Sequence, residues 1–333
     1  MFELGIAMLL LGSGLILVLL GAEWFVNAAV SIARYLKVPQ FIVGATIVSI
    51  TTTLPEAFVS GMSVYRGHTD FAIGNALGSN ICNIGLVLGF SLMFATIKIE
   101  GNLLKQQGFM MLGAGLFVYL FALPGKLTYP AGFLLISALV AYIIYLATQA
   151  RQDRSMFSDK ATISLAMHAV QDPSPGPKLI LPGGGLFLLG AIMLLGGSRL
   201  VLDGSIRLAQ VFGVSELIIA LTLISISTSL PELFVGVAAL RRKHNHLLLG
   251  NIIGANILNI ILVIGVSALI RPLPMPQQSL KLDFPIMLLL MVALLSFGLF
   301  KKCYTRREGL VFMAIYVTYL ITLAGTVFLA NEV

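Results

Sequence analysis

Ten long apolar segments dominate this sequence of 333 residues, and each is long enough to cross a hydrocarbon core of about 30 Å. Their centres lie near residues 12, 52, 84, 114, 138, 194, 228, 258, 290 and 320. The segments are continuous and do not alternate between apolar and polar residues, which favours helices over the strands of a β-barrel. Only 11% of the residues are charged, whereas soluble domains contain about a quarter. The sequence therefore predicts an all-α polytopic membrane protein with about 10 transmembrane helices.

The basic residues are distributed unevenly between the loops on the two sides of the predicted helices. With the N-terminus outside, 15 of the 21 lysines and arginines fall in inner loops, which is the positive-inside pattern. This pattern explains the net charge of +7, so the charge does not indicate a nucleic-acid partner. Membrane lipid is the partner that we expect for the apolar helices. Both termini are therefore predicted to lie outside. The two cysteines, Cys82 and Cys303, indicate neither a disulfide framework nor a metal motif.

The chain also contains an internal repeat. Residues 44–89 align without a gap with residues 220–265, and 21 of the 46 positions are identical. Chance would give roughly three, so the two segments are copies of one ancestral unit. Matching interrupted apolar segments in two halves of a membrane protein are typical of secondary transporters whose binding site lies at the bilayer midplane.

Each half contributes five predicted helices, so the second half enters the membrane from the opposite side. The loop YRGHTD at 65–70 aligns with RRKHNH at 241–246, and only the second is strongly basic, as inversion predicts. We therefore expect a first five-helix repeat at 1–150, a cytoplasmic linker at 151–178 and a second five-helix repeat at 179–333.

Two glutamates lie near the middle of apolar segments. Glu56 ends the sequence TTTLPE, and Glu232 ends the matching sequence STSLPE. Every other acidic residue falls in a loop, at a terminus or towards a helix end. A carboxylate at the bilayer centre is costly and is usually functional, so an opposed pair predicts a cation site. The prolines before them, Pro55 and Pro231, loosen the helix one turn earlier and free carbonyl oxygens.

Oxygen-bearing side chains surround both glutamates. Helical spacing puts hydroxyls on the same face as one or the other glutamate, at Ser49, Thr52 and Thr53 and at Ser225, Thr228 and Ser229. The next helix of each half carries a matching polar line, Asn75, Ser79 and Asn83 in the first and Asn251, Ala255 and Asn259 in the second. Such hard oxygen ligands suit calcium and sodium and not zinc or copper. Two structural alternatives stay open, hydroxyls that bond to their own helix and asparagines that bond between helices.

The paired motifs, each followed by GNALGSN or GNIIGAN, resemble the two alpha-repeats of the sodium/calcium exchangers of the calcium/cation antiporter superfamily, in their prokaryotic form. The resemblance implies an antiporter in which helices 2, 3, 7 and 8 surround the ions and helices 1 and 6 slide past them. It implies that the calcium ligands are Glu56, Glu232, Thr52 and Thr228. It implies that the sodium or supporting ligands are Ser49, Thr53, Ser79, Asn83, Ser225, Ser229, Ala255 and Asn259.

Two positions depart from some members of that family. Asn83 and Asn259 are both amides where several relatives carry an aspartate, which makes a potassium-dependent mode less expected. Ala255 stands where the first half has Ser79, so only its backbone carbonyl is available as a ligand.

The predicted function is therefore exchange of sodium for calcium by alternating access, with calcium exported across the plasma (inner) membrane of a prokaryote. A calcium/proton antiporter on the same fold is the main alternative, and a passive calcium channel is a further one. An enzyme such as a lipid phosphatase would need a basic side chain beside the carboxylates, and the nearest, Arg66 and Arg242, stand at helix ends. No cofactor beyond the transported Ca²⁺ and Na⁺ and no obligate protein partner are expected.

Overall fold

The computed structural model describes residues 2–36, 38–99, 103–156, 180–211, 229–301 and 303–330. Helices account for nearly all of this part of the chain, because a backbone in lipid must satisfy its own hydrogen bonds. Eight helical stretches within it are long and apolar enough to cross a membrane, namely Glu3–Leu36, Gln40–Tyr65, Thr69–Ser91, Tyr129–Ala150, Gly184–Gly204, Asn245–Ile270, Ser279–Lys301 and Arg306–Gly325. The predicted segment near residue 114 forms a further helix, and that near 228 is described only from Ser229 onward.

The first half contains five helical stretches, two of which change from α-helix to π-helix and back. Its elements are α1 (Phe2–Leu36), α2 (Gln40–Val43), η1 (Gly44–Val48), α3 (Ser49–Tyr65), α4 (Thr69–Cys82), η2 (Asn83–Leu88), α5 (Gly89–Ser91), β1 (Ile97–Lys98), α6 (Leu103–Ala122), β2 (Lys126–Leu127) and α7 (Tyr129–Met156). The last helix continues past residue 150, where the first repeat was predicted to end. Most of the predicted linker lies outside the described residues.

The second half follows the same order. Its elements are α9 (Ile180–Val211), α12 (Leu230–Arg241), α13 (Asn245–Leu258), η5 (Asn259–Ile264), α14 (Gly265–Ile270), β3 (Leu273–Pro274), η6 (Ser279–Asp283), α15 (Phe284–Lys301), β4 (Cys303–Tyr304) and α16 (Arg306–Ala330). The π-helices η2 and η5 occupy equivalent positions, since the 176-residue offset of the repeat carries Asn83 onto Asn259.

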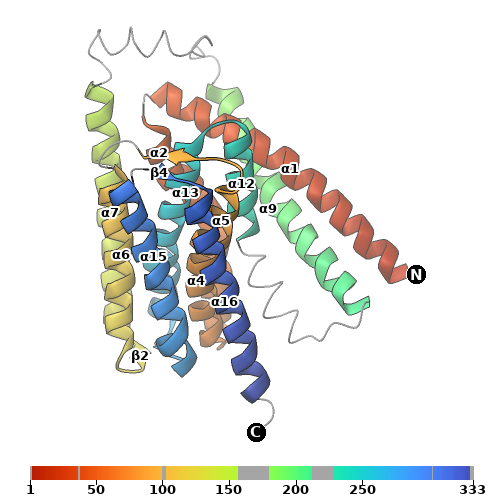
Figure 1. The fold of residues 1–333 in the computed structure, drawn as a ribbon, viewed down its shortest axis with the longest axis vertical. Helices are drawn as coiled ribbons and strands as arrows, with labels where there is room; N and C mark the ends of the chain where they lie inside the picture. The colour runs from red at the N-terminus through yellow and green to blue at the C-terminus, as the bar shows by residue number, and fades with distance from the viewer. Residues whose placement is uncertain are drawn as a thin grey trace.

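Short strand pairs connect the two halves at both ends of the molecule. β1 of the first half pairs antiparallel with β4 of the second, with Ile97 opposite Tyr304. β2 of the first half pairs in the same way with β3 of the second, with Leu127 opposite Leu273. One strand from each half in each pair is the relation that an inverted repeat requires, because equivalent loops then lie at opposite ends. In Figure 1, β4 lies near the upper end of the helices and β2 at the lower end.

The first helices of the two halves form a separate pair. α1 and α9 run side by side, oblique to the more upright helices, in Figure 1. Glycines on both helices bring the backbones together, and a Cβ at Gly14 would lie 2.7 Å from the nitrogen of Val201. A Cβ at Gly204 would lie 2.8 Å from the nitrogen of Leu11, so the pair is antiparallel. Small residues permit this close approach. The van der Waals contacts that result stabilise the pair, because lipid provides no hydrophobic driving force between helices.

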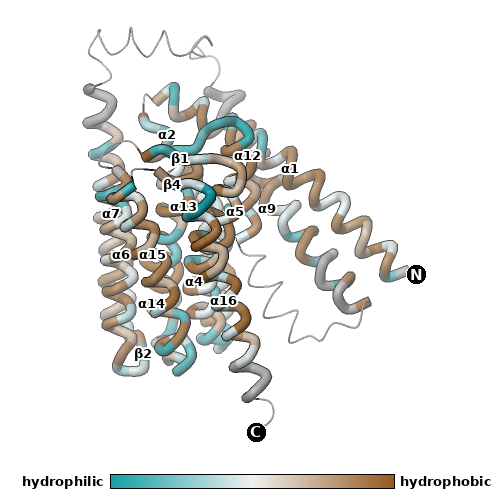
Figure 2. Tube along the Cα trace, in the orientation of Figure 1, coloured by the Kyte–Doolittle hydropathy of each residue, from teal (hydrophilic) through white to brown (hydrophobic). Residues whose placement is uncertain are grey.

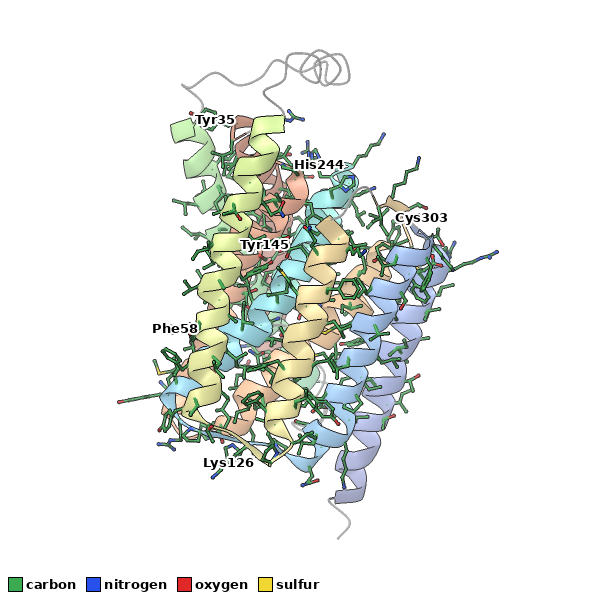
Figure 3. All side chains as sticks on the ribbon, turned by 90° about the vertical axis from the view of Figure 1, so that its left-hand side faces the viewer. Tyr35, Phe58, Lys126, Tyr145, His244 and Cys303 are labelled. Atoms are coloured by element: carbon green, nitrogen blue, oxygen red, sulfur yellow. The ribbon has the colours of Figure 1, made fainter. Side chains whose placement is uncertain are left out.

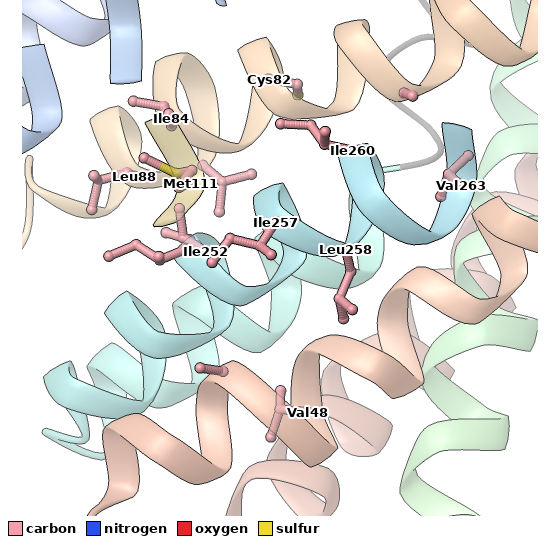
Figure 4. Packing of buried hydrophobic residues seen from close by; sticks show 14 of the residues in the cluster. Val48, Cys82, Ile84, Leu88, Met111, Ile252, Ile257, Leu258, Ile260 and Val263 are labelled. Carbon is pink, nitrogen blue, oxygen red and sulfur yellow. The ribbon is translucent and has the colours of Figure 1, made fainter. Parts of the chain in front are cut away.

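The helices that carry the polar motifs occupy the centre of the bundle. Four-fifths of the apolar window in Thr69–Ser91 and in Asn245–Ile270 is buried, at 78% and 83%. Figure 4 shows the aliphatic side chains between them, including Ile84, Ile257 and Ile260. Large apolar side chains elsewhere face outward, where lipid would cover them, and Figure 2 shows the hydrophobic residues along the helix shafts.

The two ends of the molecule differ in charge. Figure 3 places Tyr35, His244 and Cys303 towards one end and Lys126 at the other. The first end carries the loops that the positive-inside pattern predicts to be cytoplasmic, and we call it the basic end.

Candidate cation-binding site

The two predicted carboxylates lie in the interior of the bundle. Glu56 stands within α3, and Glu232 stands in the first turn of α12. Their side chains are 4% and 1% exposed. They are close enough for the charge of Glu232 to act on Glu56. Two like charges so placed repel each other in a medium of low dielectric constant, which makes a bound cation the natural counter-charge.

The carboxylate oxygens lack protein partners. None of the four oxygens of Glu56 and Glu232 has a hydrogen-bond donor among the described residues. An unpaired buried charge is much more costly than an unpaired amide or hydroxyl, so the arrangement is stable only with a cation or with protons on the carboxylates. The residues present therefore fit a transported cation.

The helix that carries Glu56 is irregular before the glutamate. The π-helical turn η1 ends at Val48, directly before Ser49, and α3 then continues through Pro55. Pro231 stands in the first turn of α12, where the missing amide costs nothing. π-helical turns are frequent at functional sites because they shift the carbonyls out of register.

Hydroxyl groups of the first half lie on the predicted face. The Ser49 hydroxyl donates to the carbonyl of Thr46 at 3.2 Å, and the Thr52 hydroxyl donates to the carbonyl of Ser49 at 3.2 Å. Their hydrogens point into the helix, so the oxygen lone pairs remain available to a cation. Thr52 also lies beside Glu232 of the other half. The hydroxyl of Thr53 is buried and has no partner among the described residues.

The second half supplies a matching but less completely described set. Ser229 is buried, and its hydroxyl is unpaired within the described part of the chain. The predicted ligands Ser225 and Thr228 lie outside the described residues. Ala255 is fully buried in α13 and can contribute only its carbonyl.

Asparagines connect the two halves at the centre. The Asn83 amide donates to the side-chain oxygen of Asn256 at 3.1 Å, and the Asn83 oxygen stays unpaired. Both amide atoms of Asn259 are buried without a partner among the described residues. Ser79 is 2% exposed and lies one turn before Asn83. The alternative of an interhelical amide bond therefore holds for the nitrogen of Asn83 and leaves its oxygen free for an ion.

One residue of this polar network was not singled out from the sequence. Ser60 is fully buried, and its hydroxyl oxygen accepts a hydrogen bond from Asn75 at 2.9 Å. Asn75 therefore serves to join α3 to α4. The signal was present, since Ser60 follows Glu56 by one helical turn on the same face.

Among the described residues, the centre holds two carboxylates together with amide and hydroxyl groups. The described residues contain no group of three or more histidine, cysteine, aspartate or glutamate side chains that could hold a metal ion. A cation bound between Glu56 and Glu232 would complete its shell with hydroxyl, amide and carbonyl oxygens, as calcium and sodium do.

A comparison with protein families matches residues 6–149 and 183–325 to the sodium/calcium exchanger protein family. The chain belongs to this family. The matched segments include both glutamates and both polar helices, and they omit the residues between 149 and 183, where the linker was predicted.

Individual exchangers and related membrane proteins are similar along almost the whole chain. The inner membrane protein YrbG of Escherichia coli is 35% identical over 86% of this chain and 87% of its own length. The sodium/calcium exchanger MaX1 of Methanosarcina acetivorans is 30% identical over 95% of this chain and 97% of its own. A solved structure of the sodium-calcium exchanger NCX_Mj, soaked with sodium and strontium, has 30% identity and a TM-score of 0.80, covering 96% of this chain and 99% of that one.

These similarities confirm the fold class, an all-α membrane protein of two inverted five-helix repeats, and they show that the chain is a cation antiporter of the exchanger family.

Proposed function

We propose that this exchanger transports calcium in one direction against sodium in the other by alternating access, with Glu56 and Glu232 as the shared ligands. The observation that carries the proposal is the pair of buried, unpartnered carboxylates contributed by α3 and α12, one from each half. Each half thus supplies one charge to a site on the boundary between them.

The charges explain the coupling. Two negative charges in a low-dielectric pocket must be neutralised before the site can close, and one divalent ion or at least two monovalent ions achieve this. An exchanger whose site holds no ions resists the change from one open state to the other. Each such change therefore moves bound calcium or bound sodium across the membrane. Any net charge moved responds to the membrane potential at about 2.3 kcal/mol per charge per 100 mV. Sodium entry would then drive calcium export.

The remaining ligands are assigned as part of the proposal. Calcium would use Thr52 and Thr228 beside the glutamates. Sodium would use oxygens from Ser49, Thr53, Ser79, Asn83, Ser225, Ser229 and Ala255, with Asn259 in support. The free lone pairs of Ser49 and Thr52 and the unpaired oxygens of Thr53, Asn83 and Ser229 support this assignment.

The organisation within the membrane follows the same reasoning. We propose a first repeat at 1–150, a cytoplasmic linker at 151–178 and a second repeat at 179–333, in the inner membrane of a prokaryote. In Figure 1, α1 starts at the right-hand side and α16 ends at the bottom, both away from the basic end, which supports external termini. A single chain would suffice for transport without a protein partner or an enzymatic step.

The test is uptake of radioactive calcium into liposomes that contain the purified protein. The liposomes are loaded with sodium and diluted into sodium-free buffer at equal pH on both sides. Uptake should require the outward sodium gradient, resist a proton uncoupler and disappear in Glu56→Gln and in Glu232→Gln. Glu3→Gln is the matched control, because its side chain is 60% exposed in an ion pair with Arg207 far from the site.

The outcomes separate the alternatives. Uptake that ignores sodium but follows a pH gradient would make the protein a calcium/proton antiporter. Calcium flux that needs no counter-ion on the opposite side would make it a channel. Full sodium-driven exchange in both glutamine variants would refute the assignment of the two glutamates.

A further inference from the structure

A cavity of about 450 Å³ opens at the basic end, away from the two glutamates. It lies between the start of α2, the end of β1, the start of α6 and the loop from α12 to α13. Its polar wall consists of Gln40, Lys243, His244 and His246. Among the described residues that line it, none is acidic. Figure 3 shows His244 at this end of the molecule.

The cavity lies in a positive field. His244 is half-buried, and its pKa is lowered first by burial and then by the nearby guanidinium groups of Arg34 and Arg242. Those same charges favour a bound anion. Arg242 is already paired with Glu23 at 3.4 Å, whereas no ion pair within the described part of the chain involves Lys243.

Lys243 has an unusual backbone conformation. Its φ is 60°, and it is the only residue other than glycine with a positive φ in the described part of the chain. The repeat places Gly67, with φ 97°, at the equivalent position of the first half. A lysine is strained in the left-handed region and a glycine is not. In the second half, Lys243 thus places a positive charge at the rim of this cavity and strains its backbone. In the first half, Gly67 avoids this strain.

The start of α13 adds donors to the same wall. This helix has 14 residues, and its N-cap residue, His244, makes no side-chain capping hydrogen bond within the described part of the chain. The amides of an uncapped first turn point outward and carry partial positive charge, so they favour an anion such as phosphate.

We propose that this cavity binds a phosphate group, supplied by the headgroup of an anionic phospholipid or by free phosphate. Lys243 would provide the charge, the imidazole of His246 a side-chain hydrogen-bond donor, and the first turn of α13 the backbone donors. The cavity also involves the transport helices, because Phe41 lines it and a Cβ at Gly250 of α13 would clash with the Phe41 carbonyl oxygen. A ligand bound here would brace α2 against α13, so occupancy should also change the rate of exchange.

The test measures binding to the purified full chain in neutral detergent with two probes, radiolabelled phosphatidylglycerol and inorganic phosphate. We expect saturable binding of one molecule per protein to the wild type. Lys243→Gly should weaken it about tenfold or more, since a hydrogen bond to a charged group is lost. This variant should fold well because glycine suits the backbone there. Lys126→Gly removes the same charge at the opposite end and should bind as the wild type does.

A second variant, His246→Asp, introduces the residue that the first half carries at Asp70 and should also weaken binding. Saturable binding of phosphatidylglycerol alone would identify a lipid site, and binding of both probes with mutual competition would identify a site for free phosphate. Absence of binding of either probe, or equal affinity in the wild type and Lys243→Gly, would overturn the proposal.

Discussion

The separation of α1 and α9 depends on glycines that have no room for a side chain, and two adjacent glycines of α9 test this dependence. A Cβ at Gly197 would lie 2.8 Å from the backbone nitrogen of Val18, whereas a Cβ at Gly196 would have no atom within 4 Å. We predict that Gly197→Ala destabilises the protein relative to Gly196→Ala.

The magnitude follows from the geometry. Both changes gain roughly the same helix propensity, about 1 kcal/mol for glycine to alanine, so their difference isolates the steric effect. Ordinary contact begins at 3.4 Å, so the helices must part from 2.8 Å by 0.6 Å at Gly197. Overpacking of this kind costs about 1–3 kcal/mol, and a gap of this size weakens the neighbouring dispersion contacts as well. We therefore expect Gly197→Ala to be less stable than Gly196→Ala by about 1–3 kcal/mol.

The chain has a built-in reporter for the measurement. Its single tryptophan, Trp24, lies on α1 next to Phe25, whose ring centre is 4.4 Å from that of Phe187 on α9. Denaturant unfolding in micelles, followed by the fluorescence of Trp24, would compare the two variants with the wild type. Equal stability of the two alanine variants would refute the argument that the glycine contact sets the helix separation.

Three further predictions concern the site and its supports. Asn256→Leu leaves the amide of Asn83 unpaired and should lower the free energy of unfolding by about 1 kcal/mol in the same assay; no change would show that the bond between the halves is not stabilising. Glu308→Ala removes the acceptor for the backbone amide of Thr305, 2.8 Å away at the start of α16, and should cost about 1 kcal/mol, while Glu308→Gln should cost less. Asn259→Asp adds a third carboxylate to the pair at the site, so calcium uptake should fall more steeply than in the wild type as the pH is lowered, because protons compete with cations for the added charge. Identical pH profiles would place Asn259 away from the ions.

The positions of the helices followed from local composition. An apolar stretch of sufficient length has one favourable conformation in lipid, because each backbone group must bond within its own segment. The inverted arrangement followed from the repeat and the number of helices in each half. The pair Glu56 and Glu232 stood out because no other acidic residue interrupts the middle of an apolar run.

Contacts between distant residues were decided only by the tertiary structure. The sequence contains Gly196 and Gly197 side by side, and only the packing of α9 on α1 shows which one is at the contact. The bond from Asn83 to Asn256 joins residues 173 positions apart, which no helical spacing could predict. The strand pairs at both ends depend on the same long-range arrangement.

The cavity at the basic end also combines features that the sequence predicts with features that only the tertiary structure decides. The sequence reveals a basic loop, and the repeat reveals that Lys243 replaces Gly67. Neither reveals that this loop faces Gln40 and Phe41 across a hollow, since those residues lie some 200 positions earlier in the chain. Periodicity and propensity report interactions within one helix, so they determined where each helix lies and which face is polar. Which helices contact one another is decided by how whole helices pack, and this packing depends on the shape of each helix surface along its full length.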